Sequence, residues 1–216
     1  ADYEFMGIKC SIGEVVNKIA AKTLQDKGVL ANCNVNIIQT IETKMFSNYQ
    51  EELKWLTTDD RRMSFLAQTI KSISSSGNTL ILVDRISAGQ TLNKKLPGSV
   101  FISGSTKNPD RKEQYDEVST ATNKIIIATY GVASVGINIP RIFNLVLIEP
   151  GKSFVRVIQS IGRGIRKAKD KDHVEIWDIT SSCKFAKRHL TQRKKFYKEA
   201  NYPYNIEKID YENSFT

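Results

Sequence analysis

The chain is poor in the residues that build metal sites, disulfide frameworks and membrane spans. Its 216 residues include three cysteines and two histidines. Cys10, Cys33 and Cys183 are scattered without a C-x-x-C pair, so no metal site and no disulfide framework is predicted. No apolar run approaches the roughly 18 residues of a membrane-spanning helix, and the first residues lack a signal-peptide pattern. We therefore expect a cytoplasmic protein with no membrane partner, whose cysteines serve as small apolar residues.

A complete phosphate-binding loop is also missing. Gly151-Lys152-Ser153 follows an apolar run and opens a helical stretch, as the end of a P-loop does. The pattern G-x-x-x-x-G-K-[ST] would need glycine at position 146, where Val146 stands. The segment Gly162-Arg163-Gly164 has no third glycine and so fails the dinucleotide-binding pattern. The sequence therefore predicts no nucleotide site that this chain completes alone.

The composition is that of one ordinary globular unit, with 40% hydrophobic and 25% charged residues. Short apolar runs predict five strands: Thr79–Val83, Val100–Ser103, Ile125–Ala128, Leu145–Ile148 and Val174–Ile179. Helical stretches lie between them, near Ala88–Leu96, Pro109–Val118 and Phe154–Lys167. Continuous apolar strands that alternate with helices predict an α/β fold, a parallel sheet with helices on both faces.

The first quarter of the chain differs from this pattern. A helix is expected from Gly13 to Gln25 and a β-rich stretch from Val29 to Ile41, whereas Glu42 to Thr58 is too irregular for any assignment. A further helix is expected from Asp59 to Ser76, with Asp59 or Asp60 as its cap. We therefore predict an N-terminal α/β extension over residues 1–58, packed on a main domain over residues 59–216 that ends in a basic helix.

The segment from Gln159 to Lys167 places polar and apolar side chains on opposite sides of a predicted helix. Planar, permanently charged guanidinium groups on a rigid helix suit a multiply charged phosphate, and glycine leaves room for close approach. The alternative is an ordinary solvated helix face. The polar stripe holds Gln159, Gly162, Arg163 and Arg166, and the apolar stripe holds Phe154, Ile158, Ile161 and Ile165.

The segment before this helix supports the functional alternative. The strand candidate Ile125–Ala128 ends at Thr129, and a turn with Gly131, Gly136 and Asn138 follows. The strand candidate Leu145–Ile148 then leads into the arginine helix. This order resembles motifs V and VI in the second RecA-like lobe of superfamily 2 helicases.

The resemblance extends over nearly the whole chain in the expected order. Thr79 to Leu92 resembles motif IV, and Ser99 to Val118, with its Gly104-Ser105-Thr106 turn, resembles motif IVa. Ile12 to Thr40 is similar to the passage by which phage UvsW-like and related helicases leave their first lobe, and Lys184 to Tyr197 resembles their closing helix. The chain thus resembles a C-terminal RecA-like helicase lobe, most similar to the UvsW-like DNA helicases.

The resemblance implies one of the two lobes of a motor protein. It implies the second lobe of an ATP-dependent DNA helicase or branch-migration translocase in recombination, replication or repair. Its cofactors, ATP and Mg²⁺, would be held mainly by a separate N-terminal RecA-like lobe. Leu80 to Asp84 has the form of a Walker B strand, but Arg85 stands where this superfamily has glutamate. This chain alone is therefore expected to be inactive.

The resemblance also implies roles for individual residues. Arg163 and Arg166 would stabilise charge on the transferring phosphoryl group, and Gln159 would couple the site to the partner lobe. The residues expected near the nucleotide are Gly136, Gly162 and Asn138, the last standing where many members have aspartate. The residues expected to hold nucleic-acid phosphates are Thr129, Gly104, Ser105, Thr106 and, as a further candidate, Arg85.

Positive charge is concentrated near the end of the chain. Residues 151–200 carry 14 Lys and Arg against 5 Asp and Glu, and this excess equals the net charge of +9. Such a field attracts a polyanion, and nucleic acid is the expected one. The resemblance implies DNA with branched or duplex/single-strand junctions as the partner. The expected contacts within Lys184–Lys198 are Lys187, Arg188, Lys194 and Lys195. The alternative is that these side chains only keep a helix soluble.

Several residues fit structural roles better than chemical ones. His189, Arg193 and Tyr197 would share one face of the last helix, where packing is a simpler role than catalysis or metal binding. Trp55 and Trp177 are expected to anchor local packing. Three other functions stay open: a non-catalytic nucleic-acid-binding module on a RecA-like scaffold, an RNA helicase lobe, and a small-ligand α/β domain. The sequence does not determine the oligomeric state.

Overall fold

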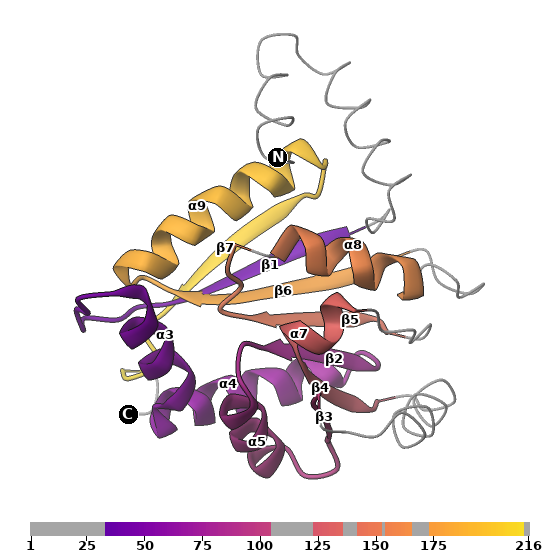
Figure 1. Ribbon diagram of the computed structural model, residues 1–216, viewed down its shortest axis with the longest axis horizontal. Coiled ribbons are helices and arrows are strands. Elements are labelled where there is room, and N and C mark those ends of the chain that lie inside the picture. The colour runs from indigo at the N-terminus through magenta and orange to yellow at the C-terminus, as the bar shows by residue number, and fades with distance from the viewer. Residues whose placement is uncertain (1–32, 105–122, 136–141, 153, 166–172, 214–216) are drawn as a thin grey trace, which may run out of the picture.

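A computed structural model describes residues 33–104, 123–135, 142–152, 154–165 and 173–213, with the backbone alone for 161–165. Its centre is a parallel sheet of seven strands in the order β3-β4-β2-β5-β6-β1-β7 (Figure 1). The strands are β1 (Cys33–Thr40), β2 (Thr79–Val83), β3 (Val100–Ile102), β4 (Ile125–Thr129), β5 (Asn144–Ile148), β6 (Val174–Ser181) and β7 (Tyr204–Ile209). The helices are α3 (Tyr49–Thr58), α4 (Asp60–Ser74), α5 (Ile86–Lys95), α7 (Tyr130–Ser134), α8 (Phe154–Ile165) and α9 (Lys184–Glu199).

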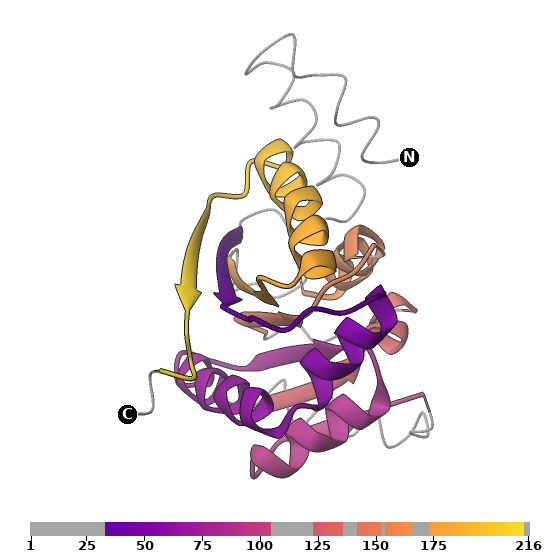
Figure 2. The same cartoon turned by 90° about the vertical axis from the view of Figure 1, so that its left-hand side faces the viewer.

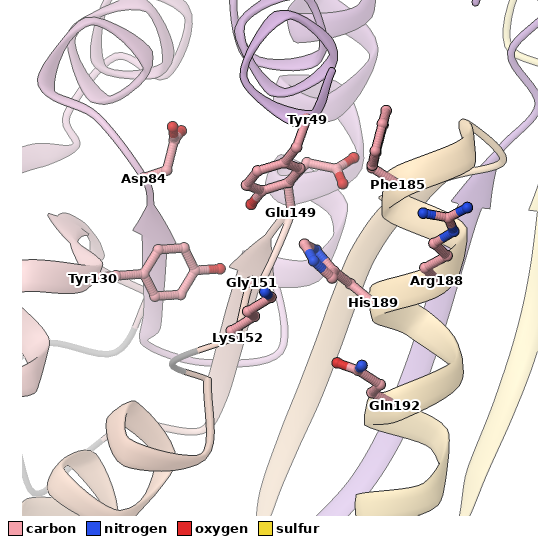
Figure 3. Close-up of a pocket in the computed structure, with 10 residues that line it drawn as sticks. All are labelled: Tyr49, Asp84, Tyr130, Glu149, Gly151, Lys152, Phe185, Arg188, His189 and Gln192. Atoms are coloured by element: carbon pink, nitrogen blue, oxygen red, sulfur yellow. The ribbon is translucent and has the colours of Figure 1, made fainter. Parts of the chain in front are cut away.

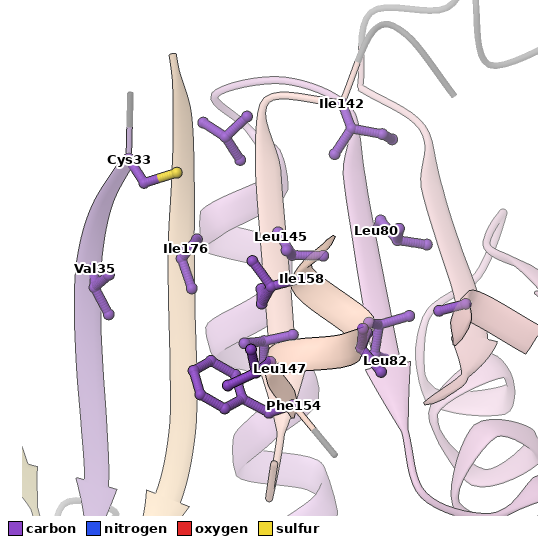
Figure 4. Close-up of a cluster of buried hydrophobic side chains, with 14 of the residues drawn as sticks. Cys33, Val35, Leu80, Leu82, Ile142, Leu145, Leu147, Phe154, Ile158 and Ile176 are labelled. Carbon is purple, nitrogen blue, oxygen red and sulfur yellow. The ribbon is translucent and has the colours of Figure 1, made fainter. Parts of the chain in front are cut away.

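Helices cover both faces of the sheet, as the α/β prediction requires (Figures 1 and 2). One face packs under α7, α8 and α9, and the other packs under α4 and α5. Strand β2 explains why its run is apolar throughout: Leu80 and Leu82 lie in the first core, while Ile81 and Val83 lie in the second. Figure 4 shows the first core, with Phe154 and Ile158 of α8 packed over the strands.

The five predicted strands and the helices α4, α5 and α8 are confirmed, with ends that shift by a few residues. Asp59 is the N-cap of α4, and its Oδ2 accepts a hydrogen bond from the Arg62 amide at 3.0 Å. The predicted helices at residues 13–25 and 109–118 lie outside the described residues. Within the described part of the chain, no helix is long and apolar enough to cross a membrane.

Three elements were not predicted: α3, α7 and β7, of which α7 lies at the start of the segment that was expected to be a turn. Helix α3 occupies the segment that was left unassigned, and its buried face includes Glu52 besides Leu53 and Leu56, which breaks the apolar pattern. Glu52 is buried because its carboxylate accepts hydrogen bonds from the amides of Phe185 and Ala186, at 2.9 and 2.8 Å, in the first turn of α9. Strand β7 is exposed along most of its length, so it lacks the apolar run that identifies a buried strand.

Strand β1 confirms the predicted β-rich stretch and lies inside the sheet, between β6 and β7. Figure 2 shows β7 at the rim, beyond β1. Helix α3 follows at the carboxyl end of the sheet, where it contacts α9. The division at residue 58 stays a prediction, although β1 and α3 belong to the same packed unit as the later strands.

Candidate functional site

The arginine helix α8 begins just after β5, at the carboxyl edge of the sheet. Phe154 and Ile158 are buried in the core, which confirms the first half of the predicted apolar stripe. Val157 is also buried, so the packed face is wider than predicted, and Gln159 is half-buried beside it. Positions 162 and 163 lie in the last turn of α8, and position 166 lies outside the described residues. The site roles of these glycine and arginine positions stay predictions.

Glu149 links β5 to α8 with a strained backbone. Its φ is 45°, a left-handed value that non-glycine residues rarely adopt. Its carboxylate accepts hydrogen bonds from Arg62 Nη2 at 2.8 Å and from Thr180 Oγ1 at 3.0 Å. Arg62 is itself buried and also donates to the Leu56 carbonyl at 2.6 Å, while its Nε lies 3.3 Å from Glu42. This network over-determines the conformation of the segment that precedes the arginine helix.

Burial dominates the electrostatics of this network. It raises the pKa of Glu149 to about 7, although the charge of Arg62, the charge of Arg193 and the hydrogen bond from Thr180 all act to lower it. Burial likewise raises the pKa of Glu42, against the lowering effect of Arg62. The Glu149 carboxyl group, with a pKa of about 7, therefore lies in the segment that connects β5 to α8.

A second buried arginine holds the next residue of the same segment. Arg193 of α9 donates from Nε and Nη2 to both oxygens of Asp178, at 2.8 and 2.9 Å, and from Nη1 to the Pro150 carbonyl at 2.8 Å. Tyr197 donates its hydroxyl to Asp178 at 2.7 Å. Asp178 thus raises the pKa of Arg193, against the effect of burial. Packing is confirmed as the role of Arg193 and Tyr197, and the charge of Arg193 is not available to nucleic acid.

Candidate phosphate contacts gather where β3, β4 and β2 end. These strands are neighbours in register, with Val83 opposite Thr129 and Ile102 opposite Ala128. The residues that follow, Arg85 and Gly104, therefore lie at the same edge as Thr129. Positions 105, 106, 136 and 138 lie outside the described residues, so their expected roles are untested.

Two of these candidates already have intramolecular contacts. Thr129 caps α7, and its Oγ1 accepts from the Val132 amide at 3.3 Å. Among the described residues its hydroxyl hydrogen has no acceptor, so the group retains a donor. Arg85 donates from Nε to Asp84 Oδ2 at 2.9 Å. Both contacts fix the side chains in place, and both leave donor capacity for a phosphate.

The candidate basic residues of α9 lie at the surface. Lys187, Arg188 and Lys195 are exposed, and Lys194 is half-buried. The Arg188 guanidinium lies over the Phe185 ring, 5.7 Å from its centroid. Exposure fits a phosphate contact and also fits a solubilising surface, so the nucleic-acid role stays a prediction.

A cavity of about 820 Å³ lies between α3 and α9 at this edge (Figure 3). The Tyr49 ring packs against His189 with centroids 4.8 Å apart. A β-carbon at Gly151 would lie 3.2 Å from the Tyr49 hydroxyl, so glycine permits this close approach. Burial, Arg193 and Lys152 lower the pKa of His189, which favours the neutral ring. The lining residues are Tyr49, Asp84, Tyr130, Glu149, Gly151, Lys152, Phe185, Arg188, His189 and Gln192.

The sequence contained one signal for this cavity that was not used. Phe185, Arg188, His189 and Gln192 are three and four residues apart and form one stripe of α9. The opposing wall could not be inferred because Tyr49 belongs to the unassigned segment that forms α3. The stripe identified one side of α9, but it did not identify the element that packs opposite that side.

The described residues do not form a complete magnesium–nucleotide site. They contain no cluster of three or more histidine, cysteine or acidic side chains suited to a metal ion. The segment Gly151-Lys152 at the end of β5 lacks the glycine-rich turn that cradles phosphates.

The fold and this edge define a class of protein: a RecA-like lobe of a helicase, in which the segment that resembles motif VI forms α8 after β5. The chain belongs to the helicase conserved C-terminal domain family, which matches residues 61–168. The family match spans β2 to β5 and the whole of α8.

Relatives agree with this assignment. The ATP-dependent DNA helicase uvsW of Enterobacteria phage T4 is 26% identical over 195 residues, which are 85% of this chain and 39% of that protein. Putative helicase 22 of a Sulfolobus islandicus filamentous virus is 30% identical over 104 residues, 46% of this chain and 18% of that protein. This chain therefore spans about two-fifths of the length of T4 uvsW.

Solved structures share the fold. The crystal structure of T4 UvsW superposes with a TM-score of 0.72 at 22% identity, over 83% of this chain and 42% of that one. The Escherichia coli DEAD-box protein SrmB, bound to regulator of ribonuclease activity A, superposes with a TM-score of 0.55 at 15% identity, over 82% and 91%. The RecA-like fold predicted from the sequence is confirmed.

Proposed function

We propose that this chain is the second motor lobe of an ATP-dependent DNA helicase or branch-migration translocase that acts in recombination, replication or repair. The observation that carries the proposal is the placement of α8. In a chain of the helicase C-terminal domain family, this helix leaves the carboxyl edge of the sheet from a segment held by Arg62 and Arg193. Such rigid support suits arginines that must meet a charge placed by another lobe.

In this proposal the chain completes a site that it does not hold alone. ATP with Mg²⁺ supplies the phosphoryl group when bound to a separate N-terminal RecA-like lobe. Arg163 and Arg166 stabilise the charge that develops on the transferring group, since planar guanidinium groups match phosphate oxygens. Gln159 couples the two lobes. The residues placed near the nucleotide are Gly136, Asn138 and Gly162.

Nucleic acid lies, in this proposal, along the carboxyl edge of the sheet. The basic side chains of α9 add electrostatic attraction that does not depend on sequence. Closure of the two lobes during each ATP cycle moves the strand. The proposal favours DNA because T4 uvsW, a DNA helicase by its name, matches 85% of this chain. The phosphate contacts at the edge are Thr129, Gly104, Ser105, Thr106 and Arg85, and those on α9 are Lys187, Arg188, Lys194 and Lys195.

Joining the chain to a lobe that carries Walker A and B motifs tests the proposal. The chain alone should show no nucleic-acid-stimulated ATP turnover, because the described residues lack a phosphate cradle. The two-lobe polypeptide should turn over ATP, and DNA should stimulate the rate. Turnover by the 216-residue chain alone at the rate of the two-lobe polypeptide would contradict the half-site proposal.

A further inference from the structure

A groove with a positively charged wall lies where the segment between β1 and α3 meets the first turns of α9. Figure 1 shows these two parts of the chain side by side, and the volume of the groove is about 580 Å³. Thr40 and Ser181 are paired at the ends of β1 and β6, so this basic groove lies at the carboxyl edge of the sheet. The cations that line it are Lys44, Lys184, Lys187 and Arg188.

Aromatic rings, rather than carboxylates, position most of these cations. Lys44 Nζ lies over the Trp55 ring, 5.0 Å from its centroid. Lys184 Nζ and the Arg188 guanidinium lie over the Phe185 ring, at 5.5 and 5.7 Å. Among the described residues, none of the four cations forms an ion pair with a carboxylate. Because a ring attracts a cation without neutralising it, the groove keeps a positive charge that an anion can compensate.

The acidic residues at the groove are buried and already have partners. Glu42 lines the groove, but its side chain is only 3% exposed, and its Oε1 lies 3.3 Å from Arg62 Nε. Tyr211 donates to the other oxygen of Glu42 at 3.2 Å. Glu52 is buried below the start of α9, where its carboxylate accepts from two backbone amides. The described surface of the groove therefore presents cations and no exposed carboxylate.

An apolar side chain lies beside the cations. Phe46 packs against Trp55, with ring centroids 5.7 Å apart, and this contact anchors the segment on α3. Met45, the residue before it, also lines the groove and is 94% exposed. A methionine in this place offers a sugar or a base an apolar contact that a free phosphate ion does not use. Closely spaced negative charges together with apolar surface are the properties of a nucleic-acid strand, and a duplex is too wide for a groove of this volume.

We propose that the basic groove binds the backbone of a single nucleic-acid strand. Consecutive phosphates contact the four cations, and a sugar or a base packs on Met45. The strand then continues along the carboxyl edge of the sheet towards Arg85 and Thr129. The inference rests on the proposed function only in that the chain must bind nucleic acid. It adds a site on the segment before α3, with Lys44 and Lys184 as contacts that the motor mechanism above does not include.

The salt dependence of binding tests the contacts of the cations. Binding of the chain to a labelled oligothymidylate strand is measured by fluorescence anisotropy at several salt concentrations. In the double variant Lys44→Gln/Lys184→Gln, the slope of log K against log salt concentration should decrease in magnitude by about 0.7 units for each lost contact. The matched control Lys71→Gln/Lys94→Gln removes the same charge from exposed positions on α4 and α5 and should keep the wild-type slope. Equal slopes in the two double variants would overturn the inference.

Met45→Ser distinguishes a strand from a free anion. This variant should bind the strand roughly 2- to 10-fold more weakly, the range for a methionine contact with a ring. Its affinity for tripolyphosphate, measured by competition with the strand, should not change. The control Ile206→Ser alters an apolar side chain that is 38% exposed on β7, and it should change neither affinity.

Two outcomes separate this inference from the proposed function. If wild-type protein binds the strand, and Met45→Ser binds it equally well, the groove takes only a charged ligand and the inference alone fails. If wild-type protein binds no nucleic acid at any salt concentration, the proposed function fails together with the inference.

Discussion

Arg193 and Asp178 form a buried two-bond ion pair between α9 and β6, and the third bond of the arginine reaches the Pro150 carbonyl. Arg193 is one of the cations that give the C-terminal part its positive excess, yet its side chain is enclosed in the core. The pair ties the basic helix and the entrance of α8 to the same strand. The Arg193 contacts therefore link α9 to the start of α8, in addition to the Arg62–Glu149 contact that holds the preceding residue.

Arg193→Leu should be strongly destabilising because it leaves Asp178 charged and buried without its partner. The expected loss in the free energy of unfolding is about 3–5 kcal/mol. Urea unfolding at pH 7 measures it, with exposed Lys195→Ala as the control that should change stability by less than about 0.5 kcal/mol. The double variant Arg193→Leu/Asp178→Asn should recover part of the loss. A single variant as stable as the control would show that the ion pair contributes nothing.

Glu149 should make stability fall as pH rises. Its pKa is raised from an ordinary value of 4.5 to about 7, so between these values the folded protein holds a proton that the unfolded chain has lost. The contribution is present below about pH 4.5 and is lost as pH approaches 7. The difference in unfolding free energy between wild type and Glu149→Gln should therefore shrink from pH 5 to pH 7, as measured by urea unfolding. A difference that grows with pH would mean that the carboxylate is stabilised by folding.

Binding of DNA should depend steeply on salt because the proposed α9 contacts release counterions. We expect a smaller salt dependence when Lys187, Arg188, Lys194 and Lys195 are neutralised together. The slope of log K against log salt concentration should decrease in magnitude by up to about one unit for each lost contact on duplex DNA. The matched control neutralises Lys71 and Lys94, which are exposed on α4 and α5 over the other face of the sheet. An unchanged slope in the four-residue variant would assign the α9 cations to solubility.

Thr129 should have two separable roles. Thr129→Val removes the hydroxyl that caps α7, with an expected loss of about 1 kcal/mol in the free energy of unfolding. It should also weaken DNA binding, because a phosphate donor is lost. Thr129→Ser restores a hydroxyl and should restore both. Fluorescence anisotropy with DNA and thermal unfolding, measured on the same samples, test both roles. If the Thr129→Val variant loses stability but binds DNA normally, Thr129 caps α7 and makes no contact with DNA.

The sheet could be predicted because its central strands are buried on both faces. Leu80 to Val83 serve two cores at once, so the run must be apolar and is easily recognised. Strand β7 could not be recognised because its residues are mostly exposed at the rim. Helix α3 was missed because Glu52, a charged residue, occupies a buried position that only its hydrogen bonds to the first turn of α9 explain.

The residues of the candidate site could also be predicted only in part from the sequence. Thr129 and Arg85 could be assigned to one edge because they follow neighbouring parallel strands. The buried roles of Arg62 and Arg193 could not be inferred, since each pairs with an acidic residue on another element, 87 residues away for Arg62 and 15 residues away for Arg193. Local spacing indicates a face of a helix, and only the tertiary fold decides whether that face meets solvent or a buried carboxylate.

The most direct test of the central claim is kcat for ATP hydrolysis by the two-lobe protein with Arg163→Ala or Arg166→Ala, at saturating ATP and DNA. Arginine fingers contribute about 10³- to 10⁵-fold to turnover in other phosphoryl-transfer enzymes. Each variant should therefore lose orders of magnitude in kcat, with a much smaller loss of DNA affinity and an unchanged melting temperature. Lysine should rescue poorly because it keeps the charge without the planar fork. Near-normal kcat in both folded alanine variants would show that these arginines do not complete an ATP site.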